Sequence, residues 1–229
     1  MNENIKHVYD ATLDPNSDRK RFFASSSLVT ATGFFRLPDL YNTLINSVLP
    51  GLMNHSNISI WSAGCSDGRE PYSIALSVQK WISQHPESRT SLFNLRASDI
   101  TEIMINTGKK NDYELGDTEK SRLAEFSDYV TFTGPSRVSI SSEICRKINF
   151  VLEDIFSHKA LKKYHILICT NVLFYYDMDF RKKIVMDLVQ NLHPGGFIYL
   201  ESMGSRFMRS LDMERIIPGS HFFRFIDGS

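Results

Sequence analysis

The stretch W-S-A-G-C-S-D-G-R-E-P-Y-S-I-A, residues 61–75, decides the fold class. It continues the β-branched run Ile58–Trp61, passes through a loop with Gly64 and Gly68, and enters a segment with helical spacing of its apolar residues. A strand, a glycine-containing loop and a helix in this order begin a βαβ unit. The stretch contains neither G-x-G-x-x-G nor G-x-x-x-x-G-K-[ST], so a nucleoside triphosphate loop is not indicated. A βα turn without a ligand stays open for this segment alone.

The alternation of strands and helices continues toward the C-terminus. The further predicted segments are the strand Phe93–Ser98, the helix from Thr101 with a stop at Gly108, the strand Ile166–Cys169, the helix with Phe180, Ile184, Val185, Leu188 and Leu192 on one side, the strand Phe197–Glu201 after the turn Pro194–Gly196, and the edge strand His221–Ile226. The strand Ile166–Cys169 is apolar without alternation, as expected for a strand covered on both faces. The pattern predicts an α/β fold with a mostly parallel, doubly wound sheet.

Residues 112–147 interrupt this pattern. Tyr129–Thr133 and Val138–Ile140 flank a Gly-Pro turn and predict a small hairpin. We therefore expect an inserted β subdomain around residues 113–147, within a main domain that spans residues 36–229.

Composition and charge exclude several classes of protein. The chain has 229 residues, and 26 basic side chains balance 26 acidic ones, so nucleic-acid binding is not predicted. The longest apolar run, His165–Tyr176, is shorter than the roughly 18 residues that indicate a membrane span. The three cysteines of the chain are too scattered for a disulfide framework and lack the spacing of metal ligands, so no metal site is expected. With no signal pattern at the N-terminus, a cytoplasmic protein is predicted.

Asp99 follows the second predicted strand. A carboxylate at such a strand end is placed to accept both hydroxyls of a ribose, which indicates a nucleoside ligand without choosing NAD or S-adenosylmethionine. The alternative is that Asp99 caps the helix that begins at Thr101.

Several segments in a fixed order carry a family resemblance. They are T-A-T-G-F-F-R (30–36), residues 61–75, A-S-D-I (97–100), C-T-N-V-L-F-Y-Y-D (169–177) and L-H-P-G-G-F-I-Y-L (192–200). Together they resemble the CheR-type chemotaxis receptor methyltransferases, from about Leu28 to Phe225. The pair F-F-R and G-R-E-P-Y-S is specific, whereas the third and fifth segments are common to many methyltransferases.

The resemblance implies a class I, Rossmann-like fold that uses S-adenosylmethionine. It implies methyl esters on glutamate side chains of chemotaxis receptors or related proteins, with a chemoreceptor cytoplasmic domain or another protein as the partner. The implied cofactor-binding residues are Thr30, Thr32, Arg36, Ala63, Gly64, Glu70, Asp99, Asp154, Ile155, Thr170 and Asn171. The implied catalytic residues are Arg36 and Tyr175. A guanidinium can fork onto a carboxylate, and an aromatic ring can lie beside a sulfonium.

This sequence departs from the family pattern at four positions. Thr30 replaces an asparagine, Leu37 and Arg69 replace acidic residues, and Thr170 replaces an arginine. Residues 1–35 also resemble only a remnant of the helical domain that the family carries there.

These departures leave alternatives open. One is a module that binds S-adenosylmethionine or S-adenosylhomocysteine without transferring a methyl group, and another is a methyltransferase for a small molecule or a different protein. The β subdomain either docks a receptor peptide or only covers the sheet edge.

Overall fold

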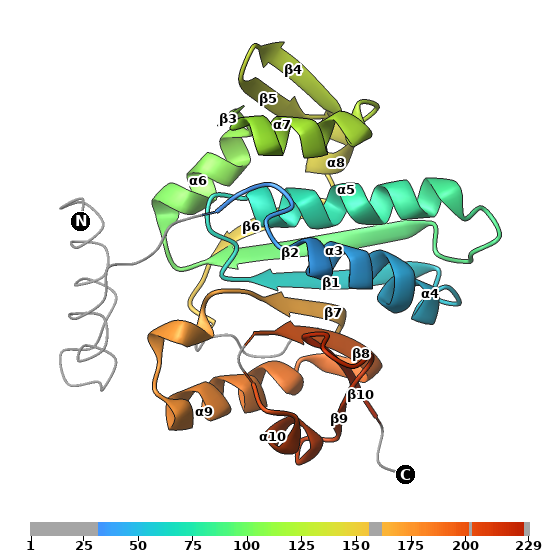
Figure 1. The fold of residues 1–229 in the computed structure, drawn as a ribbon, viewed down its shortest axis with the longest axis vertical. Helices are drawn as coiled ribbons and strands as arrows, with labels where there is room; N and C mark the ends of the chain where they lie inside the picture. Colours follow the sequence, from blue (N-terminus) through green and yellow to red (C-terminus); the bar gives the residue numbers. More distant parts are fainter. Residues whose placement is uncertain (1–31, 156–161, 202, 227–229) are drawn as a thin grey trace.

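A computed structural model describes residues 32–155, 162–201 and 203–226. Its main feature is a seven-stranded sheet in the order β6-β2-β1-β7-β8-β10-β9, with helices on both faces (Figure 1). The strands are β1 (Asn57–Ala63), β2 (Leu92–Asp99), β6 (Ile148–Leu152), β7 (Tyr164–Cys169), β8 (Leu192–Leu200), β9 (Met213–Arg215) and β10 (Phe222–Phe225). The helices beside this sheet are α3 (Pro38–Thr43), η1 (Leu44–Val48), α4 (Leu49–Gly51), α5 (Arg69–Gln84), α6 (Glu102–Lys110), η3 (Leu173–Tyr175), α9 (Met178–Val189) and α10 (Ser205–Arg209).

The pairing of the strands confirms the doubly wound sheet. β1 pairs in parallel with β2 and β7, β2 pairs in parallel with β6, and β7 pairs in parallel with β8. Only β10 and β9 add antiparallel pairs at the far side. The chain runs from β1 outward to β6 and returns to β7 on the other side of β1, so the strand order reverses between β1 and β7. Ligands of such sheets bind beyond the carboxyl ends of the strands at this reversal.

The two faces of the central strands enter separate apolar clusters. Ile60 and Ile166 are fully buried with residues of α3, η1, α4 and α5, whereas Trp61 and Leu167 are fully buried with residues of α9 and α10. Neighbouring residues of a strand point to opposite faces, so both must be apolar when both faces are covered. This packing explains the apolar run without alternation in β7.

Some predicted boundaries were wrong. Gly108 does not end its helix: α6 continues to Lys110, and Asn111 ends it in the left-handed conformation, with φ 53°. Gly108 instead lies against the Phe150 ring, 2.5 Å from where a Cβ would stand. A glycine is therefore required there by packing, and helix propensity is a secondary concern.

The C-terminal strands also differ from the prediction. β8 begins at Leu192, which the sequence pattern predicts in the preceding helix, and the Pro-Gly-Gly turn lies inside this strand. The register between β7 and β8 shifts between Tyr164 and Ile166, so the strand absorbs the extra residues as an irregularity. β10 is not the edge strand, because β9 pairs with its outer side. The helical segment from Pro38 to Gly51 was not predicted.

The inserted segment forms a second sheet in the order β3-β5-β4, drawn above the main sheet in Figure 1. Its elements, called the β subdomain below, are β3 (Tyr113–Glu114), α7 (Asp117–Leu123), η2 (Ala124–Phe126), β4 (Val130–Gly134), β5 (Arg137–Ile140) and α8 (Ser142–Cys145). β4 and β5 are the predicted hairpin.

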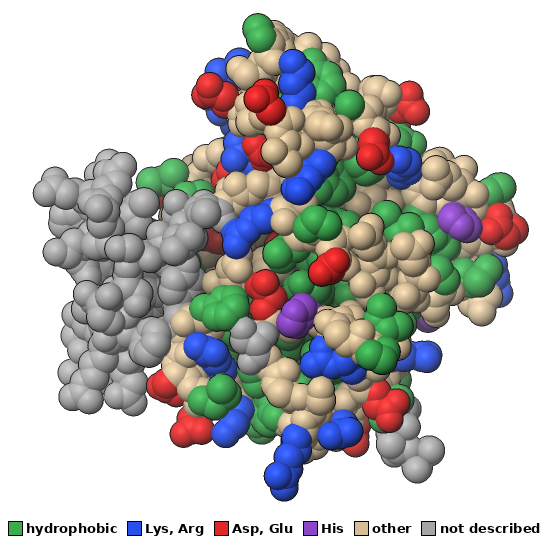
Figure 2. Space-filling model, viewed as in Figure 1, with side chains coloured by type: hydrophobic (Ala, Val, Ile, Leu, Met, Phe, Trp, Pro, Cys, Tyr) green, Lys and Arg blue, Asp and Glu red, His purple; other side chains and the backbone are tan. Residues whose placement is uncertain are grey.

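The surface agrees with the balanced composition. Acidic and basic side chains are interspersed over the face shown in Figure 2. No helix in the described part of the chain is long and apolar enough to cross a bilayer.

Three histidines meet at the opposite end of the sheet, where β1, β7 and β8 begin. The His165 ring lies between His55 and His193, with ring centroids 4.6 and 4.5 Å away. The Ser59 backbone N–H donates to His165 Nδ1 at 3.1 Å, so this nitrogen carries no proton. Burial, with help from the other two rings, lowers the pKa of His165 to about 4.

This cluster predicts a loss of stability in acid. An unfolded histidine titrates near 6.5, so between pH 6.5 and 4 the unfolded chain binds more protons than the folded one. The contribution of His165 is therefore complete above about pH 6.5 and is lost as the pH falls toward 4. We expect the thermal midpoint to fall between pH 7 and 5, by about 2–4 °C per kcal/mol lost, and to fall less in His165→Gln. The exposed His221, replaced in His221→Gln, is the control. An equal pH dependence in both variants would contradict this assignment.

Candidate functional site

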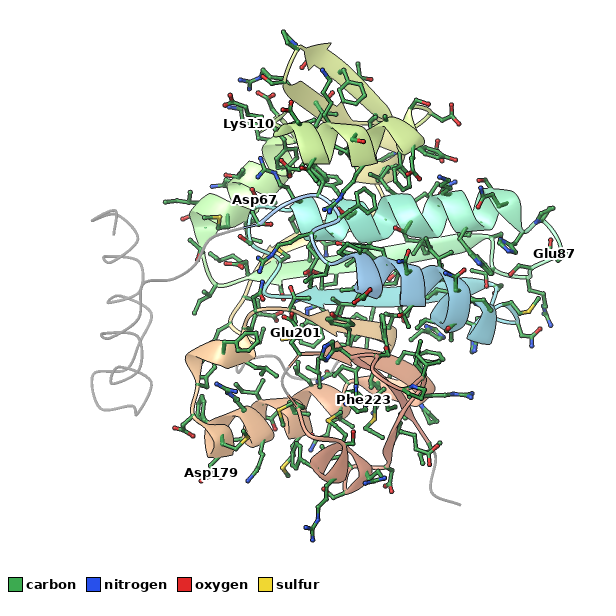
Figure 3. All side chains as sticks on the ribbon, in the orientation of Figure 1. Asp67, Glu87, Lys110, Asp179, Glu201 and Phe223 are labelled. Carbon is green, nitrogen blue, oxygen red and sulfur yellow. The ribbon has the colours of Figure 1, made fainter. Side chains whose placement is uncertain are left out.

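Polar side chains gather where the parallel strands end. Asp99 ends β2, Thr170 and Asn171 follow β7, Glu201 follows β8, and Glu70 lies in the first turn of α5. Asp67 and Glu201 are labelled in Figure 3, on the side to which β1 and β2 point. The edge thus brings together residues from four separate parts of the sequence.

The loop after β1 is fixed from both sides. The backbone N–H groups of Gly64 and Cys65 donate to Ser98 O at 2.8 and 2.9 Å. Gly64 has φ +80°, and a Cβ there would stand 2.3 Å from Val172 Cγ2. The absence of a side chain at Gly64 therefore serves the close approach of the β7 loop.

Glu70 is a partly buried carboxylate that accepts hydrogen bonds at both oxygens. Ser62 Oγ donates to Oε1 at 2.8 Å, and Thr170 Oγ1 donates to Oε2 at 2.5 Å. The pKa of Glu70 is raised to about 7: burial and, to a smaller extent, the nearby Glu201 raise it, and the two hydroxyl donors and Arg36 lower it. Thr170, which stands where the resembled family has arginine, is therefore engaged with Glu70.

Arg36 reaches the β7 loop through Asn171. With the Asn171 amide oriented so that its oxygen faces Arg36, Nη1 and Nη2 donate to it at 2.8 and 2.7 Å. The amide nitrogen then donates to Glu201 Oε2 at 3.1 Å, and the Asn171 backbone N–H donates to the same oxygen at 2.9 Å. Asn171 has φ 55°, a left-handed conformation that asparagine tolerates better than most residues. Glu201 thus fixes the residue that fixes Arg36.

Asp99 already serves the protein backbone. Its Oδ2 accepts from Ser66 N and its Oδ1 from Thr101 N, both at 2.9 Å. Burial raises the pKa of Asp99, and these bonds oppose that rise. The N-cap of α6 is Thr101, so Asp99 does not cap this helix itself but holds the turn in front of it. The contact to a ribose stays a prediction.

The remaining predicted residues lie near this edge where the structure describes them. Ala63 is buried at the end of β1, and Thr32 hydrogen-bonds to the Asp67 side chain. Glu153 N donates to Asp99 O at 2.9 Å, which places Asp154 and Ile155 just beyond β6 on the same side. Thr30 lies outside the described residues. Tyr175 ends η3, but its side chain lies outside the described part.

Two residues of the site were not predicted from the sequence. Ser62 alternates with apolar residues inside β1, and only its bond to Glu70 shows its role. Glu201 has nearly the same signal as Asp99, since an acidic residue stands at the C-terminal end of a predicted strand. Reading that signal at both strands would have found it.

The charges of this edge favour an organic ligand with groups of both signs. Within the described ranges, no group of three or more His, Cys, Asp or Glu side chains could hold a metal ion. Glu70, Asp99 and Glu201 supply carboxylates, and Arg36 supplies a forked cation. Carboxylates complement positive groups and hydroxyls, and a guanidinium complements a carboxylate.

Comparisons with known proteins identify the family. The family described as "CheR methyltransferase, SAM binding domain" matches residues 30–215. The chain belongs to the CheR methyltransferase family. A "Chemotaxis protein methyltransferase" of Vibrio anguillarum is 30% identical over 219 residues, which cover 92% of this chain and 78% of that protein. "Chemotaxis protein methyltransferase 1" of Vibrio cholerae is 27% identical with the same coverage. Among solved structures, magnesium protoporphyrin IX methyltransferase of Synechocystis with bound S-adenosylmethionine has a TM-score of 0.47 and 13% identity, covering 93% of this chain and 97% of that one.

This CheR family member is an S-adenosylmethionine-dependent methyltransferase with a class I fold. The donor set at the strand ends fits this cofactor, which carries a sulfonium, an ammonium, a carboxylate and a ribose diol. Three carboxylates and one guanidinium converge on the edge where such a molecule binds. The sequence-based prediction of family, fold and cofactor is confirmed.

Proposed function

We propose that this CheR family member forms methyl esters on glutamate side chains of a chemoreceptor cytoplasmic domain, in the cytoplasm. The observation that carries the proposal is Arg36, an exposed guanidinium held by Asn171 at the mouth of the carboxylate-lined edge. An exposed cation at this place can receive an anionic side chain from a protein substrate. The names of the two Vibrio relatives support chemotaxis proteins as the substrate class.

The proposed reaction requires little acid–base catalysis by the protein. Bound S-adenosylmethionine supplies an electrophilic methyl group. A glutamate is ionised at neutral pH, so its oxygen needs no general base, and no metal ion is required to activate it. The chain has to align the glutamate oxygen with the methyl group and the sulfonium, and it has to exclude water from the reacting groups. In this proposal Arg36 orients the substrate carboxylate, and Tyr175 lies beside the sulfonium.

The other site residues hold the cofactor in this proposal. Asp99 accepts the ribose hydroxyls, Glu70 accepts the ammonium, and Asp154 with Ile155 borders the adenine. Thr30, Thr32, Ala63, Gly64, Thr170 and Asn171 complete the cofactor-binding set.

A transfer assay tests the proposal. Receptor fragments incubated with labelled S-adenosylmethionine are expected to take up label that mild alkali releases as methanol, because a methyl ester hydrolyses in alkali and an N-methyl group does not. Fragments with glutamine in place of the glutamates are the control and should take up none. If S-adenosylhomocysteine binds in calorimetry but no fragment is labelled, the chain is a binding module or acts on another substrate.

Glu70 predicts a pH dependence of cofactor binding. Its pKa is raised to about 7, so it is ionised above that pH and protonated below it. A protonated carboxyl cannot pair with an ammonium. We therefore expect S-adenosylhomocysteine to bind about tenfold more weakly at pH 6 than at pH 8, measured by calorimetry. In Glu70→Gln binding should be weak at both pH values. A tenfold pH effect that survives in Glu70→Gln would exclude Glu70 as its source.

A further inference from the structure

The β subdomain holds the short segment that leads to Arg36 through a set of contacts with Phe34 and Phe35, called the grip below. Phe34 and Phe35 are buried, and the Phe34 N–H and the Phe35 carbonyl bond to side chains of α7. The ring of Phe34 meets Tyr113 of β3 edge-on at 5.1 Å, and the ring of Phe35 stacks on Phe126 of η2 at 4.8 Å. Three elements of the β subdomain therefore contact two consecutive residues.

Glu119 of α7 makes the first polar contact. Its Oε1 accepts from Phe34 N at 2.8 Å, and its Oε2 accepts from Gly116 N at 3.2 Å, at the start of the same helix. Arg69 Nε lies 3.7 Å from Glu119 Oε1, and the Arg69 guanidinium also lies 5.3 Å from the centre of the Tyr113 ring. Arg69, which departs from the family pattern, thus links α5 to the β subdomain.

Arg122 makes the second contact, one turn further along α7. Its Nη1 donates to Phe35 O at 2.7 Å and lies 3.5 Å from Phe34 O. Phe35 has φ 52°, a left-handed conformation that an aromatic residue keeps only when its surroundings hold it. On the other side, Phe35 N donates to Ser73 Oγ of α5 at 3.0 Å. These bonds hold the backbone turn at Phe35, and this turn directs the Arg36 side chain toward Asn171.

We propose that the β subdomain positions Arg36 for methyl transfer, with Glu119 and Arg122 as the positioning residues. The inference rests on the proposed function, which gives Arg36 its role. A guanidinium that aligns a carboxylate loses its effect when its backbone shifts, since small misplacements at a reacting centre are costly. If α7 moves relative to α5, the backbone at Phe35 and the position of the Arg36 guanidinium change with it. In this proposal the β subdomain therefore does more than cover the sheet edge.

Arg122→Met tests the proposal, with Lys120→Met as a matched control. Both variants remove one positive charge from α7, but Lys120 Nζ donates to Pro135 O in the hairpin turn, away from Phe35. We expect Arg122→Met to lower kcat about tenfold or more, and Lys120→Met to change it less than about twofold. Arg122→Lys keeps a donor and is expected to recover part of the loss. In an Arg36→Ala background, Arg122→Met should cause no further loss. An equal loss in both backgrounds would show that Arg122 acts on the fold alone and would overturn the proposal.

Hydrogen exchange supplies a measurement that needs no transfer activity. The amides of Phe34 and Phe35 donate to Glu119 and Ser73, so a peptide covering residues 33–37 reports on the grip. Exchange should be faster in Arg122→Met and in Glu119→Ala, and unchanged in Lys120→Met. Unchanged exchange in Arg122→Met would overturn the proposal even in an active enzyme. If exchange responds while the unmutated chain labels no receptor fragment, the grip exists and the proposed function is what fails.

Discussion

Replacing Arg36 by alanine is expected to lower methyl transfer by about a hundredfold or more, at least roughly 2.7 kcal/mol of transition-state stabilisation. The reason is that Arg36 is exposed at the sheet edge with both terminal nitrogens aimed at Asn171, so the variant removes the forked cation that aligns an anionic group. The fold should survive, because Phe34 and Phe35 supply the buried contacts of this segment. Circular dichroism and a labelled-methyl assay measure the two effects.

Arg36→Lys is the matched variant. An ammonium offers a point charge where a planar fork fixes two oxygens, so lysine should restore little of the transfer. S-adenosylhomocysteine affinity, measured by calorimetry, decides which anion Arg36 holds: affinity falls less than turnover for the substrate carboxylate, and both fall together for the methionyl carboxylate. A folded Arg36→Ala protein with undiminished transfer would remove Arg36 from the catalytic set.

The sheet could be predicted because its signals are local. The apolar run of β7 and the strand–glycine–helix order of residues 58–81 each lie within one short window. Two further short windows, the predicted strands Phe93–Ser98 and Phe197–Glu201, place Asp99 and Glu201 at strand ends, which lie at one edge of a parallel sheet. The family resemblance then added Arg36, Glu70 and Asn171, all of which the structure brings to this edge.

The wrong boundaries share a physical cause: tertiary contacts decided them. Gly108 resembles a helix stop, but the Phe150 ring requires it inside α6. The Pro-Gly-Gly turn resembles a break before a strand, but pairing with β7 draws it into β8. In β9, three residues pair with β10, and a strand that short has no period for a sequence pattern to show.

The pairings inside the site could not be predicted for a related reason. Thr170 and Glu70 are 100 residues apart, and Arg122 and Phe35 are 87 apart. The sequence indicates that Thr170 departs from the family pattern, but only the fold shows that its hydroxyl donates a hydrogen bond to Glu70. A substitution that resembles a defect in sequence is, in three dimensions, part of a different local arrangement.

Asp99→Ala is expected to weaken S-adenosylhomocysteine binding by about 1.5–3 kcal/mol, roughly tenfold to 150-fold. The variant leaves two ribose hydroxyls without a charged acceptor. It also removes the acceptor of the Ser66 and Thr101 backbone N–H groups, so part of the loss can come from the loops themselves. Calorimetry on the single variant therefore measures both effects together.

A cofactor analogue without the ribose hydroxyls separates the two effects. If Asp99 accepts these hydroxyls, the 2′,3′-dideoxy form of S-adenosylhomocysteine should bind the unmutated chain about as weakly as S-adenosylhomocysteine binds Asp99→Ala. Removing the hydroxyls should then change little in Asp99→Ala, because their acceptor is already gone. If Asp99 only holds Ser66 and Thr101, the losses from the variant and from the analogue add, since they concern separate bonds. Additive losses would thus assign Asp99 to the turn before α6 and leave the ribose to another residue.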